Sequence, residues 1–267
     1  MKVLVIDGCG RKGNTWELTQ CAVDAIRGKY PDTVFEELVL AKINLPLCTG
    51  CSNCFRLGHE ACPHYGTMKD IIKKIDDSDG VIICSTTYNF RETGYIKNLF
   101  DHMCSMLHRP YFYKGKALVI TTAGGVGQAQ CAESIASSLA GIGFNRCYKS
   151  SFASVSWNAY EPREKDIRKI TQAALKFASD AASGKLHSPK LKNLMPYNIM
   201  RGMGQHYTSD SEYPTMDGIW WTAPERRASA YFPQVKISVF KRLFGSVFFA
   251  LGKALGGFKN MKVTYRK

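Results

Sequence analysis

Four cysteines stand close together in the sequence, at Cys48, Cys51, Cys54 and Cys62. Their spacing, C-x2-C-x2-C-x7-C followed by a proline, allows three thiolates to surround one side of a [4Fe–4S] cubane and the fourth to complete it, much as in bacterial ferredoxins. Structural zinc more often uses two separated C-x2-C pairs, so zinc is the weaker metal alternative and free thiols are a third. These four cysteines are therefore the candidate metal ligands.

The remaining cysteines call for a different interpretation. The first ten residues, MKVLVIDGCG, do not resemble a signal peptide, so we expect a cytoplasmic protein with reduced thiols and no structural disulfides. One of these cysteines, Cys9, lies in a glycine-rich loop. The others fall in strand-like or helix-like stretches and are expected to be small core residues, namely Cys21, Cys84, Cys104, Cys131 and Cys147.

The loop 8–15, Gly-Cys-Gly-Arg-Lys-Gly-Asn-Thr, follows an apolar run and precedes a helix-like stretch. It contains G-x-G-x-x-G, a weak dinucleotide signal when it stands alone. Arg11 and Lys12 place two cations in the turn, and Asn14 and Thr15 add an amide and a hydroxyl. These groups suit a terminal phosphomonoester, whose charge approaches about −2 at neutral pH. An ordinary glycine turn with solvated cations is the alternative.

Two further loops carry polar or flexible residues. The segment 84–90, Cys-Ser-Thr-Thr-Tyr-Asn-Phe, combines hydroxyl groups with two aromatic rings, which can hydrogen-bond and stack on a flat polar ring. The segment 121–127, Thr-Thr-Ala-Gly-Gly-Val-Gly, allows close approach to its backbone N–H groups. Each segment alone could equally be a simple turn at the edge of a sheet.

The elements that must position these loops alternate along residues 1–184. Short apolar runs predict strands, and longer periodic stretches between them predict helices. The alternation indicates a three-layer α/β fold with a five-stranded parallel sheet, in which ligands bind outside the carboxyl ends of the strands. The expected strands are 3–6, 34–40, 80–85, 117–122 and 145–154, and the expected helices are 15–27, 68–75, 95–107, 131–140 and 164–182.

The motifs resemble those of flavodoxin-like NAD(P)H-dependent FMN reductases over roughly residues 1–180. Loop 8–15 is similar to their GSPRKxGNT phosphate loop, with Cys9 in place of serine. The stretch from Ser85 to Asp101 is similar to GSPVYWGNVSGxxKxxxDR and shares Tyr88, Gly94 and Lys97 with it. Thr86 replaces the proline of that motif, and Asn89-Phe90 replace Trp-Gly.

The resemblance implies FMN binding by three sets of residues. The phosphate would be held by Cys9, Arg11, Gly13, Asn14 and Thr15. The ribityl chain and the isoalloxazine would be bordered by Thr86, Thr87, Tyr88, Asn89 and Phe90. The pyrimidine edge of the flavin would meet Ala123, Gly124 and Gly125.

The resemblance also implies an activity, the passage of electrons from NAD(P)H through FMN to a small acceptor such as a quinone, a nitro or azo compound, or a free flavin. The cofactor supplies that chemistry, so no catalytic acid or base is assigned. The cysteine motif is similar to that of iron–sulfur flavoproteins, which implies an alternative: a relay of single electrons from a ferredoxin-like donor. A homodimer or higher homo-oligomer is expected.

The basic charge is concentrated in residues 185–267, the expected C-terminal extension, which hold 14 Lys+Arg against 4 Asp+Glu. A helix near its end places apolar residues on one stripe: Phe240, Leu243, Phe244, Val247, Phe248, Leu251, Ala254 and Leu255. This stripe could pack on the same subunit or on a dimer mate, or it could lie on a membrane surface as part of a non-catalytic peripheral protein. No nucleic-acid motif accompanies the charge, and no apolar run reaches the ~20 residues of a spanning helix.

Overall fold

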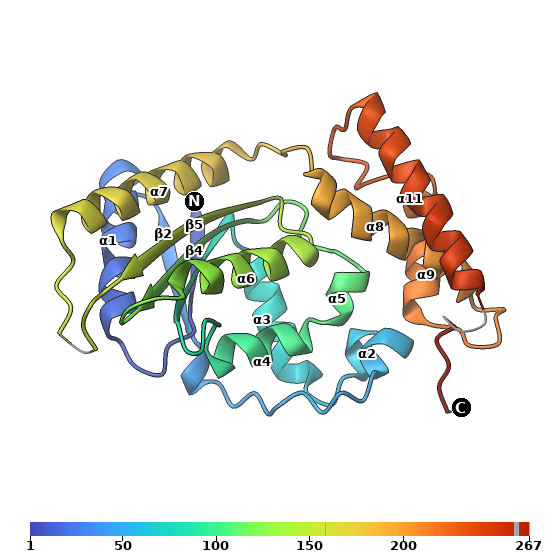
Figure 1. Ribbon diagram of the computed structural model, residues 1–267, viewed down its shortest axis with the longest axis horizontal. Helices are drawn as coiled ribbons and strands as arrows, with labels where there is room; N and C mark the ends of the chain where they lie inside the picture. Colours follow the sequence, from blue (N-terminus) through green and yellow to red (C-terminus); the bar gives the residue numbers. More distant parts are fainter. Residues whose placement is uncertain (158, 259–261, 267) are drawn as a thin grey trace.

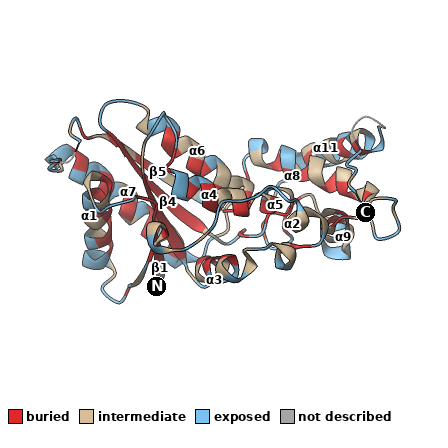
Figure 2. Cartoon of the chain, turned by 90° about the horizontal axis from the view of Figure 1, so that it is seen from below, coloured by how far each residue is buried: buried red, intermediate tan, exposed pale blue. Residues whose placement is uncertain are grey.

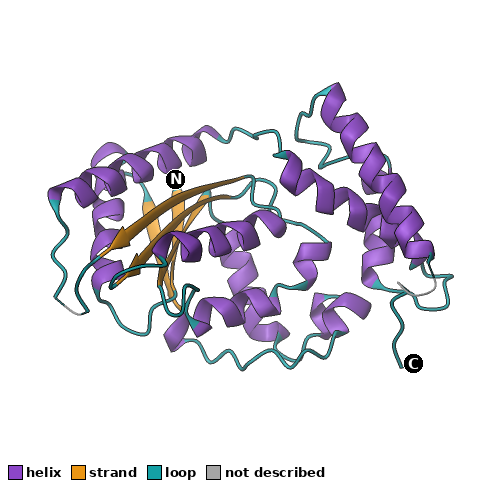
Figure 3. Ribbon diagram, in the orientation of Figure 1, coloured by secondary structure: helices purple, strands orange, loops and turns teal. Residues whose placement is uncertain are grey.

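A parallel sheet forms the centre of the computed structural model, which describes residues 1–157, 159–258 and 262–266. Its strand order is β2-β1-β3-β4-β5, and every neighbouring pair is parallel. The five expected strands are each found within one residue of their predicted ends, so the α/β class with a five-stranded parallel sheet is confirmed (Figure 3). The strands are β1 (Lys2–Asp7), β2 (Val34–Val39), β3 (Gly80–Thr86), β4 (Lys116–Ala123) and β5 (Arg146–Ala153).

Helices cover both faces of the sheet (Figure 1). One face packs against α1 (Asn14–Lys29) and α7 (Glu164–Ser183). The other face packs against α3 (Tyr65–Asp76), α4 (Gly94–His102), α5 (Ser105–His108) and α6 (Gln128–Gly141). The connection from β2 to α3 contains three short helices, η1 (Leu40–Lys42), α2 (Asn53–Arg56) and η2 (His59–Ala61).

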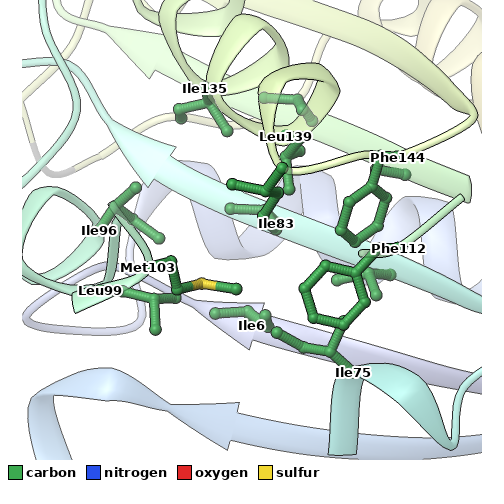
Figure 4. Close-up of a cluster of buried hydrophobic side chains, with 14 of the residues drawn as sticks. Ile6, Ile75, Ile83, Ile96, Leu99, Met103, Phe112, Ile135, Leu139 and Phe144 are labelled. Carbon is green, nitrogen blue, oxygen red and sulfur yellow. The ribbon is translucent and has the colours of Figure 1, made fainter. Parts of the chain in front are cut away.

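The alternation of side chains along each strand explains why the central strands are apolar on both faces of the sheet. Val3 and Val5 of β1 join the cluster under α1 and α7, whereas Leu4 and Ile6 join the cluster under α3, α4 and α6. A strand covered on both faces is therefore apolar along its middle, and charged residues such as Asp7 and Lys116 stand at strand ends. Figure 4 shows the second cluster, in which Ile6 and Ile83 of the sheet meet side chains from the covering helices.

The helix expected over 95–107 is divided into α4 and α5. The N–H of Met103 donates to the carbonyls of both Leu99 and Phe100, and the N–H of Cys104 donates to Asp101. These i→i−3 bonds tighten the last turn of α4 and end it before α5 begins. The turn leaves Cys104 only half-buried and outside the core clusters, so the expectation that it is a core residue is wrong.

The chain after Gly184 forms a helical unit of its own. It contains α8 (Leu191–Met203), η3 (Gly204–His206), α9 (Met216–Thr222), α10 (Pro224–Arg227) and α11 (Val239–Gly257), and residues 259–261 and 267 of the expected extension lie outside the described part. Its apolar cluster centres on Leu194, Tyr197 and Trp221. Tyr113 of the α/β part stacks on Phe232 at 4.7 Å between ring centroids, which joins the two cores.

The most exposed residues of the α11 stripe do not pack on their own subunit, whereas Phe244 of the stripe contacts the apolar cluster of the helical unit. The face that packs on α8 carries glycines instead, and a Cβ on Gly252 would lie 2.2 Å from the carbonyl oxygen of Ile199. Glycine lets the two helix backbones come this close, and it turns most of the bulky side chains of the stripe outward. Leu243 and Val247 are 63% and 64% exposed. Among the described helices, none is long and apolar enough to cross a membrane.

Candidate functional site

A polar cavity of about 570 Å³ opens where the loops after β1, β3, β4 and β5 meet. It therefore lies at the carboxyl end of the sheet, where the topology of a parallel sheet places ligands. Its lining is formed by Cys9, Gly10, Arg11, Gly13, Asn14, Thr15, Thr86, Thr87, Tyr88, Thr122, Ala123, Gly124, Ser154, Ser156 and Trp157.

The loop after β1 is shaped by one obligatory glycine. A Cβ on Gly8 would lie 2.3 Å from Cγ1 of Ile96, so only glycine allows α4 to pack this close. The carbonyl of Gly8 accepts a hydrogen bond from the hydroxyl of Thr93 at 2.5 Å, and the N–H of Gly8 donates to Cys84 at 3.0 Å. These contacts connect the loop after β1 to β3 and α4, the strand and the helix on either side of the loop after β3.

The N-terminus of α1 faces the cavity through Asn14 and Thr15. The first N–H groups of a helix have no intrahelical acceptor, and the helix dipole adds partial positive charge there. The hydroxyl oxygen of Thr15 lies 2.6 Å from that of Thr122 and 3.2 Å from that of Thr86. A helix and two strands thus share one hydroxyl network beside the N-terminus of α1, a position that suits an anion.

The loop after β3 makes a tight turn over residues 88–91. The backbones of Tyr88 and Arg91 exchange two hydrogen bonds, at 3.0 and 2.9 Å. Asn89 and Phe90 between them both have positive φ, at 49° and 65°, as the central residues of a type I′ turn do. The turn directs Phe90 toward Gly127, where a Cβ would lie 2.7 Å from the ring.

A fourth segment, 154–157, closes the cavity on the side of β5, and the sequence interpretation missed it. The guanidinium of Arg11 donates to the carbonyl of Trp157 at 3.1 Å, and the amide of Asn14 donates to the carbonyl of Ser156 at 3.0 Å. The indole of Trp157 is 89% exposed and lies at the rim, against Gly124. The sequence could have indicated this segment as part of the site, because it directly follows the fifth predicted strand.

Most of the residues expected to hold FMN are brought together by the fold. Three of them, Asn89, Phe90 and Gly125, do not line the cavity, and their expected contact with a flavin stays a prediction. The cavity is also lined by residues that the prediction missed, namely Gly10, Thr122, Ser154, Ser156 and Trp157. The predicted residues that line it are Cys9, Arg11, Gly13, Asn14, Thr15, Thr86, Thr87, Tyr88, Ala123 and Gly124.

An apolar groove of about 480 Å³ lies beside the polar cavity and shares Gly10 and Tyr88 with it. The ring of Tyr88 is 65% exposed between the two. The side of the groove away from the cavity is formed by Leu40, Ile43, Leu45, Leu47, Tyr95 and Asn98. A flat ring placed in the cavity near Tyr88 would therefore have an apolar surface next to it on which a second ring could lie.

Two thiols meet beside the first cavity loop, one from the loop itself (Cys9) and one from β3 (Cys84). Cys9 and Cys84 are buried and lie next to Asp7, whose carboxylate accepts from the N–H of Cys9 at 2.9 Å and from the thiol of Cys84 at 3.5 Å. Hydrogen bonding between the thiols holds the pKa of Cys9 below its usual value and that of Cys84 well above. Both thiols thus take part in a buried hydrogen-bond network with Asp7.

The four-cysteine motif lies on the irregular connection around α2. Cys48 and Cys51 are exposed, and Cys54 and Cys62 are half-buried. Burial raises the pKa of Cys54, whose carbonyl accepts from the guanidinium of Arg109 at 2.6 Å. The motif thus presents thiol groups toward solvent on a loop, and its donor set suits an iron–sulfur cluster.

A different grouping involves one of these cysteines and two histidines. The ligand atoms of Cys62, His64 and His102 all lie within 4.8 Å of one another, the close approach needed around a single ion. Nε2 of His102 lies 2.9 Å from Nδ1 of His64, and Nδ1 of His102 lies 2.9 Å from the carbonyl of Asn98. A cubane holds its ligand sulfurs further apart than a single ion does, so this grouping and the four-cysteine motif are separate alternatives for Cys62.

The polar cavity fits FMN in its chemistry. Arg11 and the start of α1 supply positive charge for a phosphate, the three threonine hydroxyls supply donors, and the backbone at Ala123–Gly124 lies open to a ring edge. The strand order and the position of this cavity define the chain as a flavodoxin-like α/β protein.

Residues 1–158 match the family described as NADPH-dependent FMN reductase, and the chain belongs to this family. It is 32% identical over 124 residues to an iron–sulfur flavoprotein of Clostridioides difficile (strain 630), with 46% of this chain and 54% of that protein covered. The matched part thus spans about half the length of that relative. It is 28% identical over 143 residues to an NADPH azoreductase of Bacillus sp. (strain OY1-2), with 53% and 70% covered.

Among solved structures, the apo form of an NADH:FMN oxidoreductase superimposes with a TM-score of 0.50 at 17% identity, covering 70% of this chain and 91% of that one. At this identity the likeness shows the fold alone.

Proposed function

We propose that the chain binds FMN in the polar cavity and transfers electrons from NADPH to a small aromatic acceptor held in the apolar groove beside it. The observation that carries this proposal is the shared wall: Tyr88 and Gly10 line both the cavity and the groove. The redox chemistry, namely hydride acceptance from the nicotinamide and transfer of two electrons to the acceptor, would be supplied by FMN. The overall reaction balances as NADPH + H⁺ + acceptor → NADP⁺ + reduced acceptor.

The residues of the chain would bind and orient the two partners. Arg11 and the first turn of α1 would neutralise the phosphate, and the Thr15–Thr86–Thr122 hydroxyls would fix the ribityl side. Tyr88 would meet the ring at the boundary with the groove. The groove residues Leu45, Leu47 and Ile43 would exclude water from one face of the second ring, which favours quinones and azo or nitro compounds over polar acceptors.

The reductase proposal is tested by a titration in the absence of oxygen. Protein loaded with FMN is titrated with NADPH or NADH while the flavin absorbance is followed, and then a quinone, an azo dye or a nitroaromatic is added. We expect NADPH to bleach the flavin and an apolar acceptor to restore it. A flavin that neither nucleotide reduces would overturn the proposal.

A second candidate is an iron–sulfur flavoprotein that relays single electrons, favoured by the exposed thiol motif and by the clostridial relative of that name. Cys48, Cys51, Cys54 and Cys62 would hold the cluster. Anaerobic protein is analysed for iron, acid-labile sulfide and zinc, with Cys51→Ser as the test variant and Cys131→Ser, a buried core thiol, as the control. About four irons and four sulfides per chain, lost in Cys51→Ser alone, would support the relay. Zinc without sulfide would instead indicate a zinc site, either at the four cysteines or at the Cys62–His64–His102 grouping.

A further inference from the structure

The helix α11 has two opposite faces of different character. Its inner face carries Gly245, Gly252 and Gly256, which are buried. A Cβ on Gly202 of α8 would lie 2.2 Å from the carbonyl oxygen of Phe249, so the backbones of the two helices are in direct contact. This contact attaches α11 to the rest of the chain, and Phe244 adds a contact to the apolar cluster of the helical unit.

The outer face carries large apolar side chains, and they are exposed. At 3.6 residues per turn, Val239, Leu243, Val247 and Leu251 follow one another along one side of the helix, with Phe240 beside them. Their exposed fractions run from 44% at Leu251 to 70% at Val239. A contiguous apolar surface of this kind marks a binding surface rather than an ordinary solvated face.

The charged residues in and around α11 are all basic. Residues 226–267 contain ten Lys+Arg and no Asp or Glu. On α11 itself, Arg242 and Lys253 are exposed, and Lys241 donates to the hydroxyl of Ser188. Within the described ranges, no carboxylate lies within ion-pairing distance of these three cations. The positive charge is therefore available to a partner.

The apolar face also lies away from the polar cavity. Figure 1 shows the arrowheads of β4 and β5 pointing away from α8 and α11, and Figure 2 shows α8 and α11 at the opposite end of the molecule from α1 and α7. The cavity lies at the carboxyl ends of the strands. A large partner bound at α11 would therefore leave the cavity open.

We propose that α11 binds the surface of an anionic lipid bilayer, lying in the plane of the interface with Phe240, Leu243 and Val247 among the acyl chains and its cations at the headgroups. An apolar helix face with unpaired cations and no acids is what such a surface selects. A second copy of the chain is a less suitable partner, because its α11 would carry the same positive charge. A nucleic acid is less suitable because it would not cover the apolar face. The proposal does not depend on the bound cofactor or on the electron acceptor.

The experiment is co-sedimentation of the full chain with vesicles of phosphatidylcholine alone and of phosphatidylcholine mixed with phosphatidylglycerol. We expect binding to the mixed vesicles, weakened at high salt, and little binding to the neutral ones. The variant Leu243→Gln/Val247→Gln should bind the mixed vesicles at least 10-fold more weakly. Both positions are exposed, so its thermal unfolding should match that of the wild type.

The matched control is Val34→Gln, which removes an apolar side chain that is 62% exposed at the start of β2, far from α11 in sequence and fold. It should bind vesicles as the wild type does. Equal binding by Leu243→Gln/Val247→Gln and wild type would overturn the proposal. So would a stable dimer, measured by sedimentation velocity, that dissociates in this variant, because a second copy would then cover the face.

Discussion

Arg11 is the side chain that we propose contributes most to recognition of a phosphate. It lines the cavity and donates to the carbonyl of Trp157, so it can turn to an anion without leaving the rim. Its neighbour Lys12 points elsewhere: its ammonium lies 2.9 Å from Glu37 and 4.0 Å from the centre of the Trp16 ring. Two adjacent cations of the same loop therefore have different roles.

This difference gives a prediction for substitution. Arg11→Ala should weaken FMN binding about 10- to 100-fold, because a charge-assisted hydrogen bond contributes about 1.5–3 kcal/mol. Lys12→Ala should change FMN affinity less than about 3-fold, since it removes only an exposed ion pair. Fluorescence titration of the apoproteins with FMN measures both. Equal losses in the two variants would mean that the loop acts only through its net charge.

At the scale of elements, Glu36 joins β1, β2 and α3. Its carboxylate pairs with Lys74 of α3 and, at 2.9 Å, with Lys2 of β1. The ion pair with Lys74, and then that with Lys2, lowers the pKa of Glu36. Because the pKa of Glu36 is lower in the folded state, its ionised carboxylate stabilises the fold at pH values above the usual carboxyl pKa. This stabilisation is lost as the pH falls through the lowered pKa.

Acid unfolding should reveal this contribution. Between about pH 5 and pH 3, the free energy of unfolding of Glu36→Gln should fall less steeply than that of the wild type. Glu164→Gln, at a carboxylate that is 88% exposed, is the control and should follow the wild-type curve. Urea titrations at several pH values measure the slopes. Parallel curves for Glu36→Gln and wild type would show that the pair is screened by solvent.

The contact of α8 with α11 depends on glycine. Gly252→Ala should destabilise the chain by about 1–3 kcal/mol, because its Cβ would overlap the backbone of α8 at Ile199. Gly257→Ala is the control, since the nearest atom to its Cβ would lie at 3.5 Å, an ordinary contact. Thermal unfolding compares them. Unchanged stability of Gly252→Ala would mean that α11 is held by other contacts.

The strands and the positions of the site loops could be predicted from sequence because each depends on neighbouring residues. Runs such as Val3–Ile6 are apolar because helices cover both faces of the sheet. The loops that follow these strands lie at one edge of the sheet because the strands are parallel. The inner face of α11 could not be predicted in this way. The periodicity of its large apolar residues is plain, but the close approach of Gly252 to Ile199 joins residues 53 positions apart.

The same limit explains what was missed at the site. Trp157 and Ser156 reach the cavity only because Arg11 and Asn14 bind their carbonyls across more than 140 residues of chain. Cys104 is half-buried because backbone hydrogen bonds form a turn between α4 and α5. The apolar residues around it in the sequence give no sign of this turn. Long-range contacts, rather than local propensity, decide these positions.

Across the whole molecule, the polar cavity and the basic helix occupy different ends. The α/β part, residues 1–184, holds 22 Lys+Arg against 18 Asp+Glu, whereas residues 185–267 hold 14 against 4. Asp217 of α9 joins the two parts through an ion pair with Arg109 and a hydrogen bond of 2.7 Å to Nδ1 of His108. The charge that could attract a polyanionic surface is thus carried by a unit separate from the cavity but attached to it.

The central claim is that the cavity recognises a flavin through its phosphate. Titration of the apoprotein with FMN and with riboflavin, which lacks the phosphate, tests this claim most directly. FMN should bind at least about 100-fold more tightly, because several charge-assisted hydrogen bonds from Arg11 and the start of α1 are lost with riboflavin. Equal affinity for the two flavins, or no binding of either, would contradict the claim.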